Sequence, residues 1–334
     1  MDLLTQGVLG AVLAQSGSRA QETRLATGAG FAAGLLADAD VLIRSASDPL
    51  LTIEFHRHFT HSVFFIPIGA LVAAVLLWPF LRKKIVFKRL YMYSLLGYSL
   101  SGFIDACTSY GTYLFWPLYD ERIAFHIISI VDPVFTLALI AAAVLAFRRR
   151  NYRVARAGLM FAGLYLLIGV GQMMRAESVA TSLAHSRAHQ PSRLVAKPTI
   201  GNLILWRSIY EYDGRLYVDA VRVGLASSSH PGASVKQFSV DTDLPGLGKD
   251  SILYGDIGRF RRFSDGYIGI SPEDPRFLGD MRYALMPNGL EPLWGIEINE
   301  QLPDRHAPFS FRRQFSAEKR QRFWVLLSGQ QVAQ

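Results

Sequence analysis

The chain has 334 residues, a formal net charge of +8 and a single cysteine, Cys107, and half of its residues are hydrophobic. One cysteine excludes both a disulfide within the chain and a zinc site made of several cysteines. The positive charge does not indicate nucleic-acid binding, because Arg and Lys gather in short runs between apolar segments and no nucleic-acid fold motif accompanies them.

The apolar residues concentrate in the first half of the chain and predict an α-helical polytopic membrane domain over residues 1–175. A membrane-spanning helix needs about 20 mostly apolar residues. Residues 3–14 are too few to span and predict a short N-terminal helix. We expect about five spanning helices, at residues 26–43, 63–81, 90–107, 127–147 and 157–174.

Two short basic loops predict the orientation of these helices. Arg and Lys fill residues 82–89 and 148–156, and short loops of this kind stay on the cytoplasmic side. Both loops share that side only if an even number of spans separates them, and two spans do. The pattern therefore predicts a multi-pass protein whose chain after residue 174 is extracytoplasmic.

The rest of the chain has a different composition. We expect a helical linker at residues 176–190 and a small, mostly-β extracytoplasmic domain over residues 191–334. Residues 203–209 and 216–223 are rich in β-branched and aromatic side chains, and turn signals such as Asp213-Gly214 separate the expected strands.

Ionisable side chains lie at the expected outer ends of the membrane helices. Asp38 and Asp40 end the first spanning segment, where a carboxylate that faces lipid is costly. Such a pair either caps the helix end among the lipid headgroups or faces a cation or a partner. Asp105 and Asp132 lie near the outer ends of two later segments, and for Asp132 a purely structural role fits equally well.

Three histidines, His56, His58 and His61, directly precede the segment 63–81 in a chain that has eight histidines. Imidazole is a common zinc ligand, and carboxylates suit zinc or harder ions such as manganese. The histidines either bind a metal or form a polar interfacial segment with a pH-sensitive charge. Because the topology gathers them with the aspartates at one membrane face, we predict a divalent metal site, most simply zinc or manganese.

Roles can be assigned to these residues. The predicted metal ligands are His56, His61, Asp38 and Asp40. The predicted catalytic residues are Asp105 and Asp132, each as a ligand or general base, and Arg57, which would hold an anionic substrate group such as phosphate. The sequence has no Gly-x-Ser-x-Gly motif, which argues against acyl-enzyme chemistry.

Several short motifs have a familiar order and spacing. They are Met-Asp-Leu-Leu-Thr-Gln at 1–6, Leu-Ala-Asp-Ala-Asp at 36–40, His-Arg-x-x-Thr-His-Ser at 56–62, Asp105 with Thr-Ser-Tyr-Gly-Thr at 108–112, Phe-Trp-Pro at 115–117 and Ile-Val-Asp-Pro at 130–133. Together with tail motifs at 198–202, 205–207 and 279–282 they resemble the membrane-bound metal-dependent hydrolase family, also described as LexA-binding, inner-membrane-associated hydrolases. The resemblance implies a metal-dependent hydrolase of the bacterial inner membrane.

The chain departs from the family pattern at one position. The resemblance places Asp38, Asp40, His56, His61, Asp105 and Asp132 at the polar motif positions of the family. The family pattern commonly has a histidine four residues before the aspartate of the Asp105 motif, where this chain has Ser101. Either His58 or His126, both weaker candidates, replaces that ligand, or the site binds a harder ion with water in the gap, or this member has lost activity.

These observations favour a hydrolase that acts at the outer membrane face on a lipid-linked or phosphoester substrate, with membrane lipid as its surroundings. The alternative is a non-enzymatic membrane scaffold or regulatory protein with a structural polar cluster. A transporter fits less well, since the polar residues gather at one face and do not cross the bilayer. We do not expect a LexA contact, because the predicted topology leaves only short loops and the N-terminus in the cytoplasm, and no protein partner is predicted.

Overall fold

The computed structural model describes residues 1–330, and its contacts divide the chain into two units. The helical unit contains residues 1–43, 55–171 and 200–202, and the C-terminal unit contains residues 44–54, 172–199 and the chain from residue 203 onward. In the middle of the chain the division falls between residues 171 and 172. Residues 44–54 are the exception, because they interrupt the membrane domain in sequence and group with the C-terminal unit.

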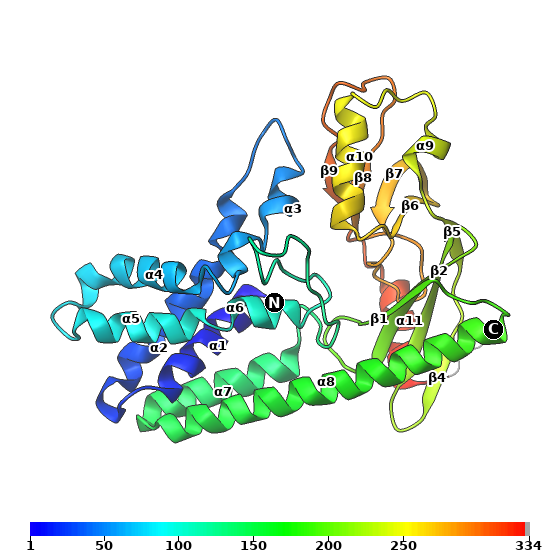
Figure 1. Ribbon diagram of the computed structural model, residues 1–334. Helices are drawn as coiled ribbons and strands as arrows, with labels where there is room; N and C mark the ends of the chain where they lie inside the picture. The colour runs from blue at the N-terminus through cyan, green and yellow to red at the C-terminus, as the bar shows by residue number, and fades with distance from the viewer. Residues whose placement is uncertain (331–334) are drawn as a thin grey trace. The chain divides into compact units, whose positions relative to one another are not determined.

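The helical unit consists mainly of short helices (Figure 1). Asp2 begins the first helix by accepting a hydrogen bond from Thr5 N at 3.1 Å. In chain order the elements before the C-terminal strands are α1 (Leu3–Ser16), η1 (Ala20–Glu22), α2 (Thr23–Leu36), η2 (Ala37–Leu42), α3 (Leu51–Phe55), η3 (Phe59–His61), α4 (Ile66–Leu81), α5 (Phe87–Tyr98), α6 (Ser101–Ala106), α7 (Pro133–Arg149) and α8 (Tyr152–Ser186).

Within residues 1–330, two helical segments are long and apolar enough to cross a membrane, Ala20–Leu42 and Tyr152–Ser186. The pair Leu51–His61 and Ile66–Leu81 also passes as one segment, although it is bent by 91°. α5 has 12 residues and α7 has 17, fewer than the roughly 20 that cross a bilayer. The expected number of about five spans is therefore not confirmed, because breaks before α6 and α7 shorten the apolar helices.

Glycines allow three helices of this unit to pack with their backbones in contact. A Cβ atom on Gly30 of α2 would lie 2.3 Å from the carbonyl oxygen of Gly10 in α1. A Cβ atom on Gly97 of α5 would lie 2.5 Å from Gly30 Cα. Small residues at helix interfaces permit this approach, which replaces side-chain packing with close backbone packing. These contacts hold α1, α2 and α5 together. Gln6 lies on α1, Asp38 follows α2, and Asp105 follows α5 on the next helix.

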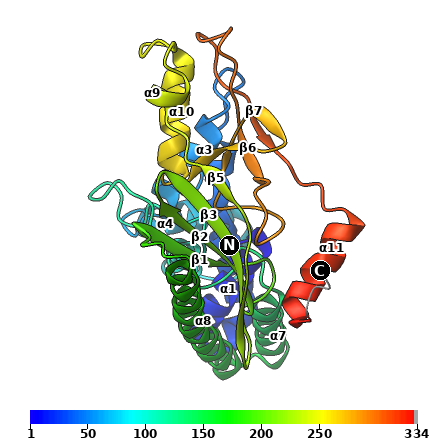
Figure 2. The same ribbon diagram turned by 90° about the vertical axis from the view of Figure 1, so that its right-hand side faces the viewer.

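The C-terminal unit is mostly β, as expected, and the described residues form two antiparallel sheets (Figure 2). The first sheet has the order β1-β2-β3-β4 with β5 also paired to β3, and the second has the order β6-β7-β8-β9. The elements are β1 (Arg193–Pro198), β2 (Leu205–Tyr212), β3 (Arg215–Val223), β4 (Ser227–His230), β5 (Ser234–Lys236), α9 (Val240–Asp243), α10 (Ile252–Phe263), β6 (Ile268–Ser271), β7 (Asp274–Asp280), β8 (Trp294–Glu297), β9 (Phe309–Phe311) and α11 (Ala317–Ser328).

The hairpin between β2 and β3 follows from its turn residues. Asp213 and Gly214 have φ values of 49° and 66°, the left-handed region that two-residue hairpin turns require. The turn sets the register in which Ile209 faces Val218, and both side chains enter a core with Leu216, Tyr267 and Met281. The turn signal expected at Asp213-Gly214 is thus the turn of this hairpin.

The tail motif residue Arg207 has a structural role in the C-terminal unit. Its side chain is 4% exposed and donates hydrogen bonds to the carbonyl oxygens of Met281, Met286, Pro287 and Gly289. Burial lowers the pKa of Arg207 to about 9, although the nearby carboxylates of Asp280 and Asp219 act in the opposite direction. Arg207 therefore ties β2 to the irregular chain that follows β7.

We expect Gly30→Ala to destabilise the helical unit by about 1–3 kcal/mol, because the added methyl group overpacks the contact with α1 and α5. Gly28→Ala is the matched control on the same helix, since a Cβ atom there meets nothing within 4 Å. That control should leave stability unchanged or raise it by up to about 1 kcal/mol. Thermal unfolding of the two variants in detergent measures the difference, and equal midpoints would contradict the packing argument.

Candidate metal site

Five side chains that the sequence predicts at one membrane face lie together in the helical unit. Asp38 and Asp40 are placed by η2, the 3₁₀ continuation of α2, and His61 is placed by η3. His56 follows α3, and Asp105 lies on α6. These five side chains form two groups of possible ligand atoms, Asp38–His61–Asp105 and Asp38–Asp40–His56, and in each the atoms lie within 4.8 Å of one another. Within residues 1–330 a third such group, Asp48–Asp256–His306, belongs to the C-terminal unit.

The imidazole of His61 lies between three carboxylates. Its Nε2 atom is 2.9 Å from Asp105 Oδ2 and 3.5 Å from Asp38 Oδ1. Its Nδ1 atom is 3.4 Å from Asp40 Oδ2. The side chain of His61 is fully buried, so these carboxylates supply most of its polar surroundings. The ring thus separates Asp40 on one side from Asp38 and Asp105 on the other.

Asp40 is held by the turn that carries the histidines. Its Oδ2 atom accepts hydrogen bonds from Arg57 N and from Thr60 Oγ1, each at 2.7 Å. Its Oδ1 atom lies 3.1 Å from Nδ1 of His56. Asp40 therefore shapes the turn from His56 to His61 and orients the His56 ring. Both of its carboxylate oxygens already have partners, so Asp38 is the better placed of the two to bind an ion.

Two buried atoms in the group Asp38–His61–Asp105 lack a hydrogen bond. Asp38 Oδ2 and His61 Nε2 have no hydrogen-bond partner within residues 1–330, although both are buried. The short distance from His61 Nε2 to Asp105 Oδ2 lacks hydrogen-bond alignment. Buried polar atoms are nearly always paired, so unpaired ones that converge on one place need an explanation such as an ion. Carboxylate oxygen and imidazole nitrogen are the donors that zinc and manganese accept.

Arg57 is an internal partner of the site. Its Nε atom is 3.3 Å from Asp105 Oδ2, and Nη1 donates to Thr108 Oγ1 at 3.3 Å. Its backbone has a positive φ of 59°, and its carbonyl oxygen accepts from Thr112 Oγ1 at 2.9 Å. The side chain is 4% exposed. The predicted role of holding a substrate anion therefore suits Arg57 less well than neutralising Asp105 does.

One side of the site, formed by His56, is more exposed than the rest. The side chain of His56 is 27% exposed, whereas that of His61 is fully buried. Arg122 donates to the carbonyl oxygen of His56 at 2.8 Å, and its guanidinium lies 4.8 Å from the ring centre of Tyr110. His56, Tyr110 and Arg122 are half-buried, so they form the more exposed side of the site.

Sequence reasoning missed several residues that assemble the site. Gln6 Nε2 donates to Asp105 Oδ2 at 2.8 Å, and Tyr98 OH donates to the carbonyl oxygen of Thr60 at 2.8 Å. A Cβ atom on Gly102 would lie 2.0 Å from the carbonyl oxygen of His61, so only glycine lets η3 approach α6. Gln6 lies in a motif that the sequence offered, whereas the contact of Gly102 depends on tertiary structure that no local pattern reports.

Ser101 lies on α6 four residues before Asp105, on the same side of the helix. It is 4% exposed and lines a gap, too small for water, together with residues of α1 and α5. Gln6 lines the same gap and donates to Asp105. In this chain an amide from α1 therefore reaches the aspartate, and the side chain at position 101 packs against α1.

Three predicted candidates lie apart from the two ligand groups. Asp132 caps α7, since Oδ1 accepts from Phe135 N at 3.0 Å and Oδ2 accepts from Tyr165 OH at 2.9 Å. The ring of His58 packs among aromatic side chains, with the ring centre of Tyr113 at 4.4 Å. His126 belongs to neither ligand group within residues 1–330. The structure therefore gives no support to a replacement of the expected histidine by His58 or His126.

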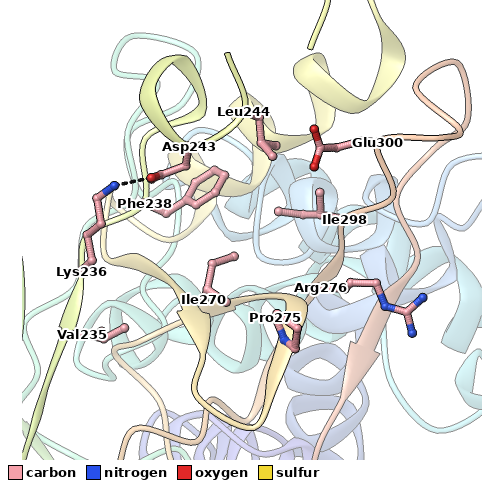
Figure 3. A pocket seen from close by; sticks show the side chains of 10 residues that line it. All are labelled: Val235, Lys236, Phe238, Asp243, Leu244, Ile270, Pro275, Arg276, Ile298 and Glu300. Atoms are coloured by element: carbon pink, nitrogen blue, oxygen red, sulfur yellow. Dashed lines mark hydrogen bonds and ion pairs between the residues drawn. The ribbon is translucent and has the colours of Figure 1, made fainter. Parts of the chain in front are cut away.

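The C-terminal unit has an open pocket of about 380 Å³ (Figure 3). Phe238, Ile270 and Ile298 line it, and Lys236 pairs with Asp243 at its edge. Among the described residues its lining contains no group of acidic and histidine ligands. Charged side chains also line the pocket, those of Lys236, Asp243, Arg276 and Glu300, so its surface is mixed and separate from the ligand groups among the described residues.

Comparison with known proteins gives one match. A family model described as YdjM inner membrane protein matches residues 1–176. No curated protein and no solved structure matches the chain. The match covers every predicted site residue, and it indicates an inner-membrane family without assigning a hydrolase activity, a cofactor or a LexA contact.

Because Asp132 caps α7 and belongs to no ligand group among the described residues, we expect its replacement to affect stability and not metal binding. Asp132→Ala should destabilise the helical unit by about 1 kcal/mol, because α7 loses its N-cap, whereas Asp132→Asn should retain the cap. Neither change should alter the affinity for zinc or manganese. Thermal unfolding and metal titration of both variants measure this, and loss of metal binding in Asp132→Asn would show that Asp132 is a ligand after all.

Proposed function

The chain belongs to the YdjM inner membrane protein family, and from that premise we propose that its helical unit is a metal-dependent hydrolase. The observation that carries the proposal is the group Asp38–His61–Asp105, with its convergent buried atoms that lack hydrogen bonds. We assign these three side chains as the ligands of a divalent ion, zinc or manganese. The neighbouring group Asp38–Asp40–His56 shares Asp38 and offers a second ion position.

The charge balance supports an ion. Asp38, Asp40 and Asp105 are at most 5% exposed, and burial of ionised carboxylates is costly unless positive charge or hydrogen bonds compensate them. Arg57 lies beside Asp105, and hydrogen bonds satisfy Asp40. The Oδ2 atom of Asp38 has no hydrogen-bond donor among the described residues. A divalent ion between Asp38, His61 and Asp105 compensates that carboxylate directly.

When bound, such an ion lowers the pKa of a coordinated water and polarises a phosphoryl or carbonyl oxygen. The protein residues supply the rest. Asp40 Oδ1 lies beside Nδ1 of His56 and orients the ring, so that Nε2, the other ring nitrogen, is the atom that can accept a proton from water. Arg57 and Gln6 hold Asp105 in place, and His56 forms the edge through which water and substrate enter.

The surroundings favour an amphipathic substrate, lipid-linked or a phosphoester. Asp38 and Asp40 lie within Ala20–Leu42, a segment apolar enough to cross a membrane. Leu42 and Leu118 are 77% and 79% exposed, which suits contact with lipid. A divalent ion held by carboxylates would stabilise the negative charge on the phosphoryl oxygens when a phosphoryl group is transferred to water.

One observation favours the alternative, a non-enzymatic membrane scaffold or regulatory protein. Arg57 already neutralises Asp105, and Ser101 stands where the resembling family commonly has a histidine. In that case the polar cluster holds helices together and binds no ion. Metal binding and hydrolysis separate the two functions.

We expect the purified protein to hold about one or two equivalents of zinc or manganese. His61→Ala should weaken the affinity for the ion at least about tenfold, because it removes a ligand between two carboxylates. His58→Ala is the matched control, three residues away in the aromatic cluster, and should bind as the wild type does. Elemental analysis and titration give the metal content.

On the same samples, the metal-loaded protein in lipid vesicles should hydrolyse bis(p-nitrophenyl) phosphate, and His56→Ala should retain the ion but lose most of the rate. A metal-free wild type whose thermal stability does not respond to added zinc or manganese would refute the metal site. A loaded protein without hydrolysis would favour the scaffold.

We further propose that the C-terminal unit is extracytoplasmic. If the bent pair counts as one span, the chain has three candidate spans, and the basic loops 82–89 and 148–156 then lie on one side and the C-terminal unit on the other. Alkaline phosphatase fused to the C-terminus should be active and green fluorescent protein at the same place should be dark. The opposite pattern would place the unit in the cytoplasm.

A further inference from the structure

Residues 44–54 lie between the two stretches of chain that form the two halves of the candidate site. One half contains Asp38 and Asp40, the other contains His56 and His61, and Asp40 contacts His56. By their contacts residues 44–54 belong to the C-terminal unit, although the chain on both sides of them belongs to the helical unit. The segment contains most of α3, which lies beside α10 (Figure 2). The C-terminal unit thus holds the chain that sets the spacing between the two halves.

A single side chain on α10 makes the main polar contacts with this segment. Arg259 donates to both carboxylate oxygens of Asp48, at 3.0 and 2.9 Å. It also donates to both carboxylate oxygens of Glu54, at 2.6 and 2.7 Å. Two-pronged contacts of this kind fix direction as well as distance, because the guanidinium is planar and its donors form a rigid fork.

Arg259 is itself anchored from within the C-terminal unit. Asp256, which is 1% exposed, accepts from Arg259 at 3.0 Å and from the backbone nitrogen of Ala307 at 2.8 Å. Nδ1 of His306 lies 3.0 Å from the same carboxylate. Asp48, Asp256 and His306 also lie close enough to hold an ion, but their carboxylate oxygens already accept from Arg259, His306 or backbone groups. The group is therefore an ion-pair hub.

The charges in the hub reinforce one another. Burial raises the pKa of Asp48, but the hydrogen bond and charge of Arg259 outweigh burial, so the pKa lies below its usual value. The hydrogen bonds that Arg259 donates to Glu54 and Asp48 hold the pKa of Arg259 above its usual value. Both partners thus stay charged across the physiological pH range.

We propose that Arg259 is a positioning residue for the candidate metal site, which it orders by holding residues 44–54. This inference rests on the proposed function for the identity of the site. A loose connection between Asp40 and His56 must lose conformational freedom when the ligands come together, and a segment that is already held loses less. The family match ends at residue 176, so the C-terminal unit supplies this constraint from outside the matched region.

The experiment combines two readouts on the full-length protein in detergent. A spin label at Ala46→Cys reports the mobility of the segment, because Ala46 is exposed and the native Cys107 is buried. Titration with zinc or manganese reports the site. Arg259→Gln should raise label mobility and weaken metal affinity about tenfold, since coupled charge networks give effects of this order. Arg261→Gln, at an exposed position of the same helix, is the matched control.

Two further variants separate positioning from a general loss of structure. Arg259→Lys keeps the charge and loses the fork, so it should give intermediate affinity. The double variant Asp48→Asn/Glu54→Gln should match Arg259→Gln, and combining all three changes should add little, because each removes the same contact.

The outcomes are distinct. Increased label mobility with unchanged metal affinity, or full additivity of the changes, would overturn the positioning role. Unchanged label mobility in Arg259→Gln would overturn the hold on the segment. If the wild type binds no metal, the proposed function fails, and label mobility still decides whether Arg259 holds residues 44–54.

Discussion

Burial of three neighbouring carboxylates is the constraint on which the helical unit depends. Asp38, Asp40 and Asp105 lie around one imidazole ring and are at most 5% exposed. Like charges at such distances repel, and burial strengthens the repulsion unless donors or cations intervene. The turn from His56 to His61 exists in its observed form because its backbone and Thr60 supply donors to Asp40. The local structure of the histidine segment is thus a consequence of the aspartates.

The carboxylates can meet only because backbones approach closely elsewhere. Gly10, Gly30 and Gly97 bring α1, α2 and α5 together, and Gly102 admits the carbonyl group of His61 to the surface of α6. These contacts bring Gln6 to Asp105 and lead α2 to η2, where Asp38 and Asp40 lie. In a membrane, where burial of apolar side chains between helices gives little driving force, close packing at small residues and polar contacts take its place. The glycine contacts and the polar cluster therefore depend on each other.

From apolar segment lengths and basic loops, the sequence led us to expect Asp38, Asp40, His56, His61 and Asp105 at one membrane face. The structure brings these side chains together but does not confirm the five spans on which that expectation relied. The sequence also predicted the mostly-β C-terminal region from strand composition and turn residues. It did not predict where the apolar stretches break. The break before α6 lies beside a contact between residues far apart in sequence, Gly102 with His61. α7 begins at a local cap, in which Asp132 accepts from Phe135 N. The sequence could not separate Asp132 from Asp105, because their distant partners, Tyr165 and Gln6, depend on tertiary structure.

Two acid–histidine groups of this chain show that proximity alone does not define a metal site. Asp48, Asp256 and His306 satisfy the same distance requirement as Asp38, His61 and Asp105. In the first group Arg259 and backbone donors already use the lone pairs of the carboxylates. In the second, Gln6, Arg57 and the Met1 amine contact Asp105, but Asp38 Oδ2 and His61 Nε2 are buried without a hydrogen-bond partner among the described residues. A cation would displace Arg259 from the first group at the loss of its ion pairs, whereas it would complete the second, so the charge already present decides which group is suited to an ion.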